Sequence, residues 1–279
     1  MKAGSGLAQG RLTEPELAAR AVESAMARAR LTHAQAVLLY LSADFAHAPQ
    51  AAITAAARAA NCTQVAGCTA AGVFSDEDWV LDAPAAAALV LCDGPALRGA
   101  TPDSEPVLTF AAPNALDLHW LAGGGARFGG VSGDASGQGP YTVWSGGRAS
   151  QAGRCELALA GVDLAVGVSQ GIRPLSRPAS IGRVEGHDLR VVGGEAALSS
   201  LTRELPLSER APERIPTHLL LAGVPYGPAE RAVEEGRFHL LPLISANAAD
   251  RSVTVAGQLE PGIDLFWARR QPGAAEHDM

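Results

Sequence analysis

Residues 167–171 read Gly-Val-Ser-Gln-Gly, which fits the G-x-S-x-G pattern of a catalytic serine on a nucleophile elbow. In such an elbow a helix begins directly after the serine, exposes its hydroxyl and supplies oxyanion donors. Here Arg173 and Pro174 follow, and Pro178 comes soon after, so a helix is prevented. A serine hydrolase is therefore the least favoured of the functional alternatives.

Asp134 is a carboxylate placed among glycines, in the run Gly-Asp-Ala-Ser-Gly at 133–137. Glycines let backbone approach a ligand closely, so this carboxylate is a candidate ligand contact. The alternative is an Asx-type turn, in which the side chain bonds to its own loop. The sequence leaves both interpretations open.

Histidine and cysteine spacing predicts no zinc site. The seven histidines show no H-E-x-x-H pattern. No C-x-x-C spacing occurs among the four cysteines, which we expect to be reduced and mostly buried; they are Cys62, Cys68, Cys92 and Cys155. A single histidine suffices as an axial ligand of haem iron, so haem remains an open alternative.

Composition disfavours phosphate-loop and Schiff-base chemistry. Among the 22 basic residues the sole lysine is Lys2, in a Gly/Ser-rich N-terminus that we expect to be loose. The glycines at 123–125 and 129–130 do not match the dinucleotide fingerprint, because a strand follows them where a helix is required. We expect no nucleotide cofactor.

The chain as a whole has the composition of a globular protein. It has 279 residues, of which 47% are hydrophobic and 18% charged, enough for one large or two smaller domains. A net charge of −7 argues against a nucleic-acid or anionic-lipid partner. The longest apolar run, 83–92, is too short to span a bilayer, and the N-terminus lacks a signal-peptide stretch. We expect a cytoplasmic protein.

The first 70 residues predict one strand-helix-strand unit behind an opening helix. Thr13 and Glu16 form a capping-box pattern, and apolar residues then recur at helical spacing to Ala29. The segments 36–41 and 64–69 are apolar runs of strand length on either side of an alanine-rich helix at 49–60.

After Gly72 the apolar runs become short and strand-like, separated by Gly, Pro, Asp and Asn. Gly146 and Gly147 predict a hairpin turn. Residues 205–216 resemble a linker, and 218–270 predict strands with a short helix near 228–235. The fold class is α+β, with layered mixed and antiparallel sheets and helices on the outer faces. Strands are expected at 87–91, 107–110, 128–131, 141–144, 155–159, 164–168 and 189–192.

Two glycine-rich strand ends resemble each other at an offset of 63 residues. They read Val-Ala-Gly-Cys-Thr at 65–69 and Phe-Gly-Gly-Val-Ser at 128–132, and each precedes a polar loop and a small-residue strand. We interpret this as an indication of internal duplication.

Four motifs occur in the order typical of FIST (F-box and intracellular signal transduction) proteins, which this chain resembles. They are Val-Ala-Gly-Cys-Thr-Ala-Ala-Gly at 65–72, Phe-Gly-Gly-Val-Ser-Gly-Asp at 128–134, Val-Ser-Gln-Gly-Ile-Arg-Pro at 168–174, and the segment 189–198. The resemblance implies an N-terminal tail and helix over 1–33, a FIST N-like domain over 34–204 and a partial FIST C-like domain over 205–279.

The resemblance also implies a function. It points to a non-enzymatic bacterial sensory domain that binds a small ligand, such as an amino acid, and relays to a histidine kinase, a cyclic-dinucleotide enzyme or a chemotaxis receptor. Some relatives are haem proteins that sense nitric oxide, and this is the main alternative.

We place the ligand contacts on these motifs. Arg173 supplies a planar donor pair for an amino acid's carboxylate, and Asp134 an acceptor for its ammonium. The glycines expected to allow close backbone approach are Gly67, Gly130 and Gly171. The residues offering shorter polar contacts are Cys68, Thr69 and Ser132.

The C-terminal segment departs from the family pattern. The segment 238–247 lacks the family's arginine and its closing glycine and aspartate, and relatives continue beyond the point where this chain stops. We therefore expect the apolar strand 263–267 to lack a partner and to favour self-association.

Overall fold

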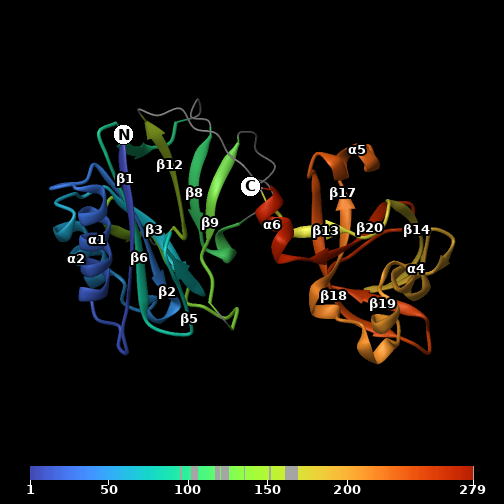
Figure 1. Ribbon diagram of the computed structural model, residues 1–279. Helices are drawn as coiled ribbons and strands as arrows, with labels where there is room; N and C mark the ends of the chain where they lie inside the picture. The colour runs from blue at the N-terminus through green and yellow to red at the C-terminus, as the bar shows by residue number, and fades with distance from the viewer. Residues whose placement is uncertain are drawn as a thin grey trace. The chain divides into compact units, whose positions relative to one another are not determined.

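A computed structural model describes residues 1–94, 96–101, 106–116, 120, 126–134, 136–150, 152–160 and 169–278. The chain forms two compact units, 1–166 and 167–279, and each is described by itself (Figure 1). Mixed and antiparallel sheets with helices beside them confirm the α+β class.

The first unit contains a six-stranded sheet in the order β1-β6-β2-β3-β10-β11. β2 and β3 are parallel and joined through helix α2, which confirms the predicted strand-helix-strand unit, and the other pairs are antiparallel. Gly146 and Gly147 form the predicted turn, with φ of 57° and 73°. The strands are β1 (Lys2–Gln9), β2 (Ala36–Ser42), β3 (Val65–Ala70), β6 (Ala85–Cys92), β10 (Val143–Ser145) and β11 (Arg148–Ser150).

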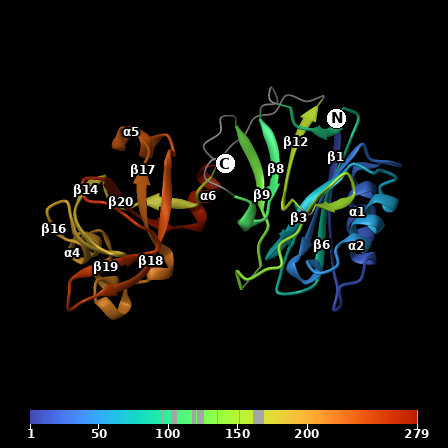
Figure 2. The same cartoon turned by 180° about the vertical axis from the view of Figure 1, so that it is seen from behind.

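Helices α1 (Glu16–Ala29) and α2 (Gln50–Ala59) cover one face of this sheet, as both views show (Figures 1 and 2). Their apolar stripes pack on the inward side chains of β2 in one core. The predicted capping box is wrong: Pro15 occupies the N-cap position and no side chain caps the helix. A short 3₁₀ helix, Ala43–Phe45, follows β2.

The expectation of a loose N-terminus is also wrong, because residues 2–9 form edge strand β1, paired with β6. A β-carbon on Gly4 would lie 2.5 Å from the Ala25 carbonyl oxygen, and one on Gly6 would lie 2.2 Å from that of Ala21. Glycine at these positions lets α1 lie directly on the strand. The composition that suggested flexibility therefore serves close packing.

The second sheet of this unit, β7-β12-β8-β9, repeats the plan of the first. In chain order its strands β7, β8, β9 and β12 correspond to β1, β2, β3 and β6, with the same neighbours and the same directions. The one parallel pair of this sheet, β8 with β9, corresponds to β2 with β3. This shared topology supports the predicted internal duplication. The strands are β7 (Ala96–Gly99), β8 (Val107–Ala111), β9 (Arg127–Val131) and β12 (Arg154–Ala160), with a 3₁₀ helix at Pro113–Ala115.

Gly67 and Gly129 occupy equivalent positions in the two parallel pairs. Gly67 has φ +154° opposite Leu39, and Gly129 has φ +142° opposite Thr109. A β-carbon would lie 1.8 Å from the Leu39 oxygen in one case and 2.0 Å from the Thr109 oxygen in the other. For these glycines the structural repeat has an offset of 62 residues, one fewer than the sequence match indicates.

The two sheets pack face to face around a second core. Ala66 and Leu91 of the first sheet and Leu108 and Leu157 of the second contribute to this core. Phe110 stacks edge-on against Tyr40, with ring centroids 5.8 Å apart. A small separate hairpin, β4 (Gly72–Phe74) with β5 (Trp79–Leu81), lies beside this sandwich.

The second unit is built around antiparallel strands that close into a ring through β20, which pairs with both β14 and β17. The core inside it is centred on side chains such as Leu189, Leu265 and Trp267. Its strands are β13 (Ile172–Pro174), β14 (Ala179–Glu185), β15 (Asp188–Val192), β16 (Glu195–Ala196), β17 (Leu220–Pro225), β18 (Phe238–Asn247), β19 (Ser252–Val255) and β20 (Asp264–Arg270). Its helices are α4 (Ala197–Glu204), α5 (Ala229–Glu234) and α6 (Pro272–Asp278), with 3₁₀ helices at Leu207–Glu209, Pro212–Arg214 and Thr217–Leu219.

Two expectations for this unit are corrected. The strand at 263–267 is not an unpartnered edge, because it belongs to β20, which is paired on both sides. The segment 205–216 is not a linker between compact units, because Leu205 and Ile215 are buried in the core of the second unit. The units divide at 166/167, whereas the family-based division was placed at 204/205. The strand expected at 164–168 and the glycines at 123–125 lie outside the described residues.

We predict that Gly129→Ala destabilises the protein more than a neutral glycine substitution does. The added β-carbon meets the Thr109 carbonyl, and the backbone is in a region that L-residues avoid, so a loss of about 1–3 kcal/mol in the free energy of unfolding is expected. Gly67→Ala should behave alike, and Gly99→Ala, with open space around it, is the control. Urea denaturation measures all three, and equal values for Gly129→Ala and Gly99→Ala would contradict the assignment.

Candidate functional site

A cavity of about 630 Å³ lies in the first unit, among β2, β3 and β6 of the first sheet, β9 of the second and hairpin strand β4. Of the residues predicted to contact a ligand, Cys68 and Gly130 line it. A β-carbon on Gly130 would lie 3.6 Å from the Cys68 sulfur, which is an ordinary contact. The glycine therefore leaves room in the cavity, but the backbone conformation does not require a glycine at this position. The remaining lining residues are Ser5, Tyr40, Ala70, Gly72, Val73, Phe74, Ser75, Asp76, Ala87, Ala88, Leu89, Gly129 and Val131.

The floor of the cavity is apolar and electrically neutral. Burial raises the pKa of the Tyr40 hydroxyl to about 12, and nearby Cys68 adds to the shift. Burial likewise raises the pKa of the Cys68 thiol to about 12, with a smaller contribution from Cys155. Both groups therefore keep their protons at neutral pH, and Tyr40 offers a hydroxyl that donates and accepts hydrogen bonds.

The rim of the cavity carries a carboxylate. Among the described lining residues, Asp76 alone is charged. The Ser5 hydroxyl donates to Asp76 Oδ1, and Arg28 Nη1 lies 3.0 Å from the same oxygen, so Oδ2 keeps acceptor capacity. The hydrogen bond from Ser5, and then Arg28, lower the pKa of Asp76, which is ionised at neutral pH. Arg28 also pairs with Glu77.

Thr69 and Ser132 brace the two sheets and do not line the cavity. Their hydroxyl oxygens lie 2.6 Å apart, with both residues almost completely buried. Thr69 Oγ1 also accepts from the Thr142 N–H at 3.2 Å, and the Gly133 N–H donates to the Thr69 carbonyl at 3.2 Å. These contacts join the end of β3 to the end of β9, next to the walls that Cys68 and Gly130 supply.

The Asp134 carboxylate is occupied by its own loop. It accepts hydrogen bonds from the Ser136 hydroxyl at 2.6 Å, the Gly137 N–H at 2.6 Å and the Gly139 N–H at 3.1 Å. These bonds, led by the one from Ser136, lower its pKa. The structure thus favours the Asx-type turn, the second of the two interpretations that the sequence left open.

Three other predicted residues are not among the described residues that line the cavity. Gly67 contacts the β2 backbone and Trp144. Gly171 has φ +58°, and its carbonyl accepts from the Gln271 N–H at 3.1 Å. Arg173 is an exposed residue of β13 in the second unit, so neither unit by itself contains an Asp134–Arg173 pair. That pairing stays a prediction.

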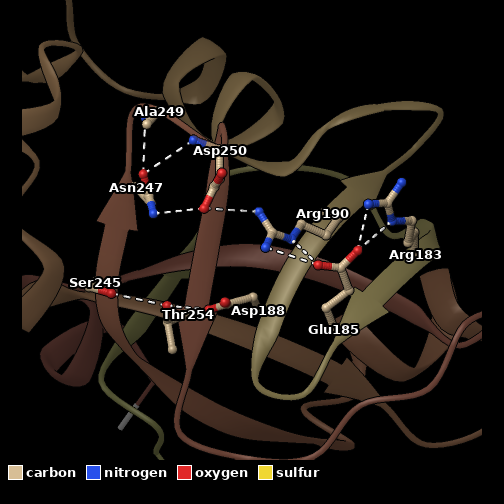
Figure 3. Close-up of polar contacts among 9 residues, drawn as sticks. All are labelled: Arg183, Glu185, Asp188, Arg190, Ser245, Asn247, Ala249, Asp250 and Thr254. Carbon is tan, nitrogen blue, oxygen red and sulfur yellow. Dashed lines mark hydrogen bonds and ion pairs between the residues drawn. The ribbon is translucent and has the colours of Figure 1, made fainter.

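The second unit carries a polar cluster of its own, drawn in Figure 3. Glu185 accepts hydrogen bonds from Arg183 and Arg190, each at 3.0 Å from Nε, and Arg190 also pairs with Asp250 at 3.3 Å. Arg183 and then Arg190 lower the pKa of Glu185. Asn247 completes the cluster by donating to Asp250. Because these charges satisfy one another, the cluster braces exposed strands and is not a candidate ligand site.

The sequence analysis missed the hairpin side of the cavity, including Phe74 and Asp76. A signal was present, because two short apolar segments, 72–74 and 79–81, flank an acidic four-residue turn, as expected of a hairpin. Tyr40 and the alanines of β6 gave no functional signal, since they occur in ordinary apolar strands.

The FIST N domain family matches residues 35–195, which is more than half of the chain. The chain therefore belongs to the FIST family, and the matched region covers most of the first unit and continues into the second. The family is a sensory one that acts in signal transduction. Among curated proteins, none matches this chain.

Two further properties concern the described part of the chain. None of its helices combines the length and apolar character needed to cross a membrane. Its His, Cys, Asp and Glu side chains form no group of three placed to hold a metal ion.

We predict that Thr69 and Ser132 are energetically coupled. Ser132→Ala removes one partner of the buried Thr69 hydroxyl, which keeps its contact with Thr142, so a loss of about 0.5–1.5 kcal/mol is expected. Thr69→Val costs more, because the Ser132 hydroxyl and the Thr142 N–H both lose a partner. The double variant should be more stable than the sum of the two losses predicts, by about 1 kcal/mol. A double-mutant cycle by urea denaturation measures this, and strict additivity would show that the two hydroxyls do not interact.

We also predict that stability declines in alkaline solution through Cys68 and Tyr40. The unfolded thiol loses its proton near the ordinary pKa of 9.0, whereas the folded thiol keeps it to about 12. Between these values the folded state binds more protons, so the free energy of unfolding falls as pH rises. Cys68→Ala and Tyr40→Phe should each flatten this fall in denaturation series, with curves parallel to the wild type below about pH 8. An unchanged slope in both variants would refute the assignment.

Proposed function

We propose that the first unit is the ligand-binding part of a signal-transduction sensor and that a small molecule binds in the cavity bordered by Cys68 and Gly130. The observation that supports this most directly is the cavity itself, which has a size common for small-molecule sites (about 300–1,000 Å³) and an apolar floor with few polar groups. Its walls include two of the family's glycine-rich strand ends.

The ligand class that we propose is an amino acid with a small apolar side chain. Asp76 at the rim supplies an acceptor for the ammonium, and the side chain contacts Ala87, Leu89 and Val131. Tyr40 supplies a neutral hydrogen-bonding group. In this proposal Asp76 takes the role expected of Asp134, whose carboxylate is already bonded to its loop.

Haem is the competing ligand, and the cavity gives it little support. No histidine is among the described residues that line the cavity. The nearest alternative ligand atoms, the Cys68 sulfur and the Tyr40 oxygen, keep their protons at neutral pH. An absorbance spectrum of the purified protein tests this alternative, since bound haem gives a strong Soret band.

The partner and location that we propose follow the family. The sensor works in a bacterial cytoplasm and relays to a histidine kinase, a cyclic-dinucleotide enzyme or a chemotaxis receptor, and it carries out no reaction. The absence of catalysis is supported at the one elbow-like motif, because Ser169 is followed by the extended strand β13 and not by a helix.

We predict that Gly130→Val abolishes ligand binding at a small cost in stability. The added side chain extends past Cys68 into the cavity without backbone strain. In a thermal-shift screen of amino acids, a ligand at about one hundred times its Kd stabilises the wild type by about 2.7 kcal/mol, and Gly130→Val and Asp76→Asn should lose that shift. Gly133→Ala, with open space around it, is the control. Absence of any shift across the screen, or a full shift in Gly130→Val, would refute the proposal.

A further inference from the structure

The β4–β5 hairpin displays an apolar strip. In its register Phe74 lies opposite Trp79, and Gly72 lies opposite Leu81. Phe74 is 75% exposed, Trp79 64% and Leu81 54%. The alternate pair, Val73 with Val80, points the other way and is buried. The strip is therefore one face of the hairpin, defined here as the side chains of Phe74, Trp79 and Leu81.

Such exposure contrasts with the burial of four other large aromatic side chains. Trp144 and Trp267 are almost completely buried, and so are Phe110 and Phe266. Exposed apolar patches with aromatic side chains are the usual anchors of protein interfaces. The strip thus has the composition of a docking surface.

The charge around the strip defines the chemistry of its partner. The hairpin segment 72–82 contains four carboxylates and neither lysine nor arginine. Arg28 from α1 pairs with Asp76 and Glu77, which leaves Asp78 and Asp82 outside that cluster. A partner surface with apolar side chains flanked by lysine or arginine is complementary to this arrangement, whereas an anionic lipid surface is repelled.

The same hairpin forms a wall of the cavity. Residues 72–76 line it, and Val73 packs with Tyr40, Ala70 and Ala87 in a small core. Phe74 belongs both to the cavity lining and to the apolar strip, so a ligand in the cavity contacts the element that carries the strip.

We propose that the strip on β4–β5 is the output surface of the sensor and binds a basic, apolar protein segment of the signalling partner. Docking at the strip stands on the exposure and charge described above. A change in docking when the cavity fills rests, in addition, on the proposed ligand function.

The test uses two designed helical peptides, one of leucine and lysine and one of leucine and glutamate, titrated into the full chain. The leucine-lysine peptide should bind saturably and shift the emission of exposed Trp79 to shorter wavelength. Its affinity should fall as salt is added. Trp79→Ser and Leu81→Ser, which lie outside the cavity lining, should each reduce its affinity at least about tenfold, and Asp78→Asn with Asp82→Asn should reduce it further. Leu207→Ser, at an 82% exposed leucine of the second unit, is the matched control and should not change it.

Three outcomes overturn docking at the strip: equal binding of both peptides, equal affinity in Trp79→Ser and wild type, or a dimer in sedimentation that Trp79→Ser abolishes. The last would show that a second copy of the chain covers the strip. Repeating the titration with an amino acid identified by thermal shift separates the two proposals. An amino acid that binds but leaves peptide affinity unchanged overturns the coupling alone, and peptide binding without any amino acid ligand overturns the ligand proposal alone.

Discussion

The buried hydrogen bond between Thr69 and Ser132 is the contact on which the arrangement of the first unit depends. It lies where the parallel pair β2–β3 meets the parallel pair β8–β9, and it is 2.6 Å long between residues that solvent hardly reaches. A buried hydroxyl without a partner is costly, so the two sheets are held in the one alignment that pairs these groups. That alignment places Cys68 opposite Gly130 across the sandwich, and the cavity follows from the space that a glycine leaves there.

The two repeats share a backbone plan but differ on their outer faces. In the first sheet Leu39, which packs with the helices, pairs with Gly67 and Ala88, and in the second the equivalent Thr109 pairs with Gly129 and Glu156. Glu156 accepts from Trp120 Nε1 at 3.2 Å and Arg127 Nε at 3.0 Å. The inner faces of both sheets remain apolar, because they must pack on each other. The cavity thus lies between the apolar inner faces that the two sheets share, while their outer faces differ in chemistry.

The elements that could be predicted from the sequence are those whose signal is local. The strands at 36–41 and 107–110 are short apolar runs of strand length, and the pair Gly146-Gly147 favours a tight turn. What could not be predicted depended on distant partners. Gly4 and Gly6 suggest a loose tail until helix α1 is placed on them, and Asp134 has the same sequence context whether it binds a ligand or its own loop. Part of the cavity lining was predicted, through Cys68 and Gly130. The other wall comes from the β4–β5 hairpin, and no spacing in the sequence reveals that this hairpin contacts β2.

The hairpin is attached to the sandwich in a way that suits a moving part. β4 and β5 pair only with each other among the described strands, so shifting them breaks no backbone ladder of either main sheet. Their attachments include the small core around Val73 and Val80, the polar contacts of Asp76 with Ser5 and Arg28, and the ion pair of Arg28 with Glu77. Exposed ion pairs contribute little to stability, and the core around Val73 and Val80 contains fewer buried residues than either core of the sandwich. Under the proposed function, a ligand at the free Oδ2 of Asp76 shares this carboxylate with Arg28, which contacts Oδ1. Under the proposed function, ligand binding can therefore change the hairpin's position without breaking the backbone ladders of β3 or β9, whose ends are joined by Thr69 and Ser132.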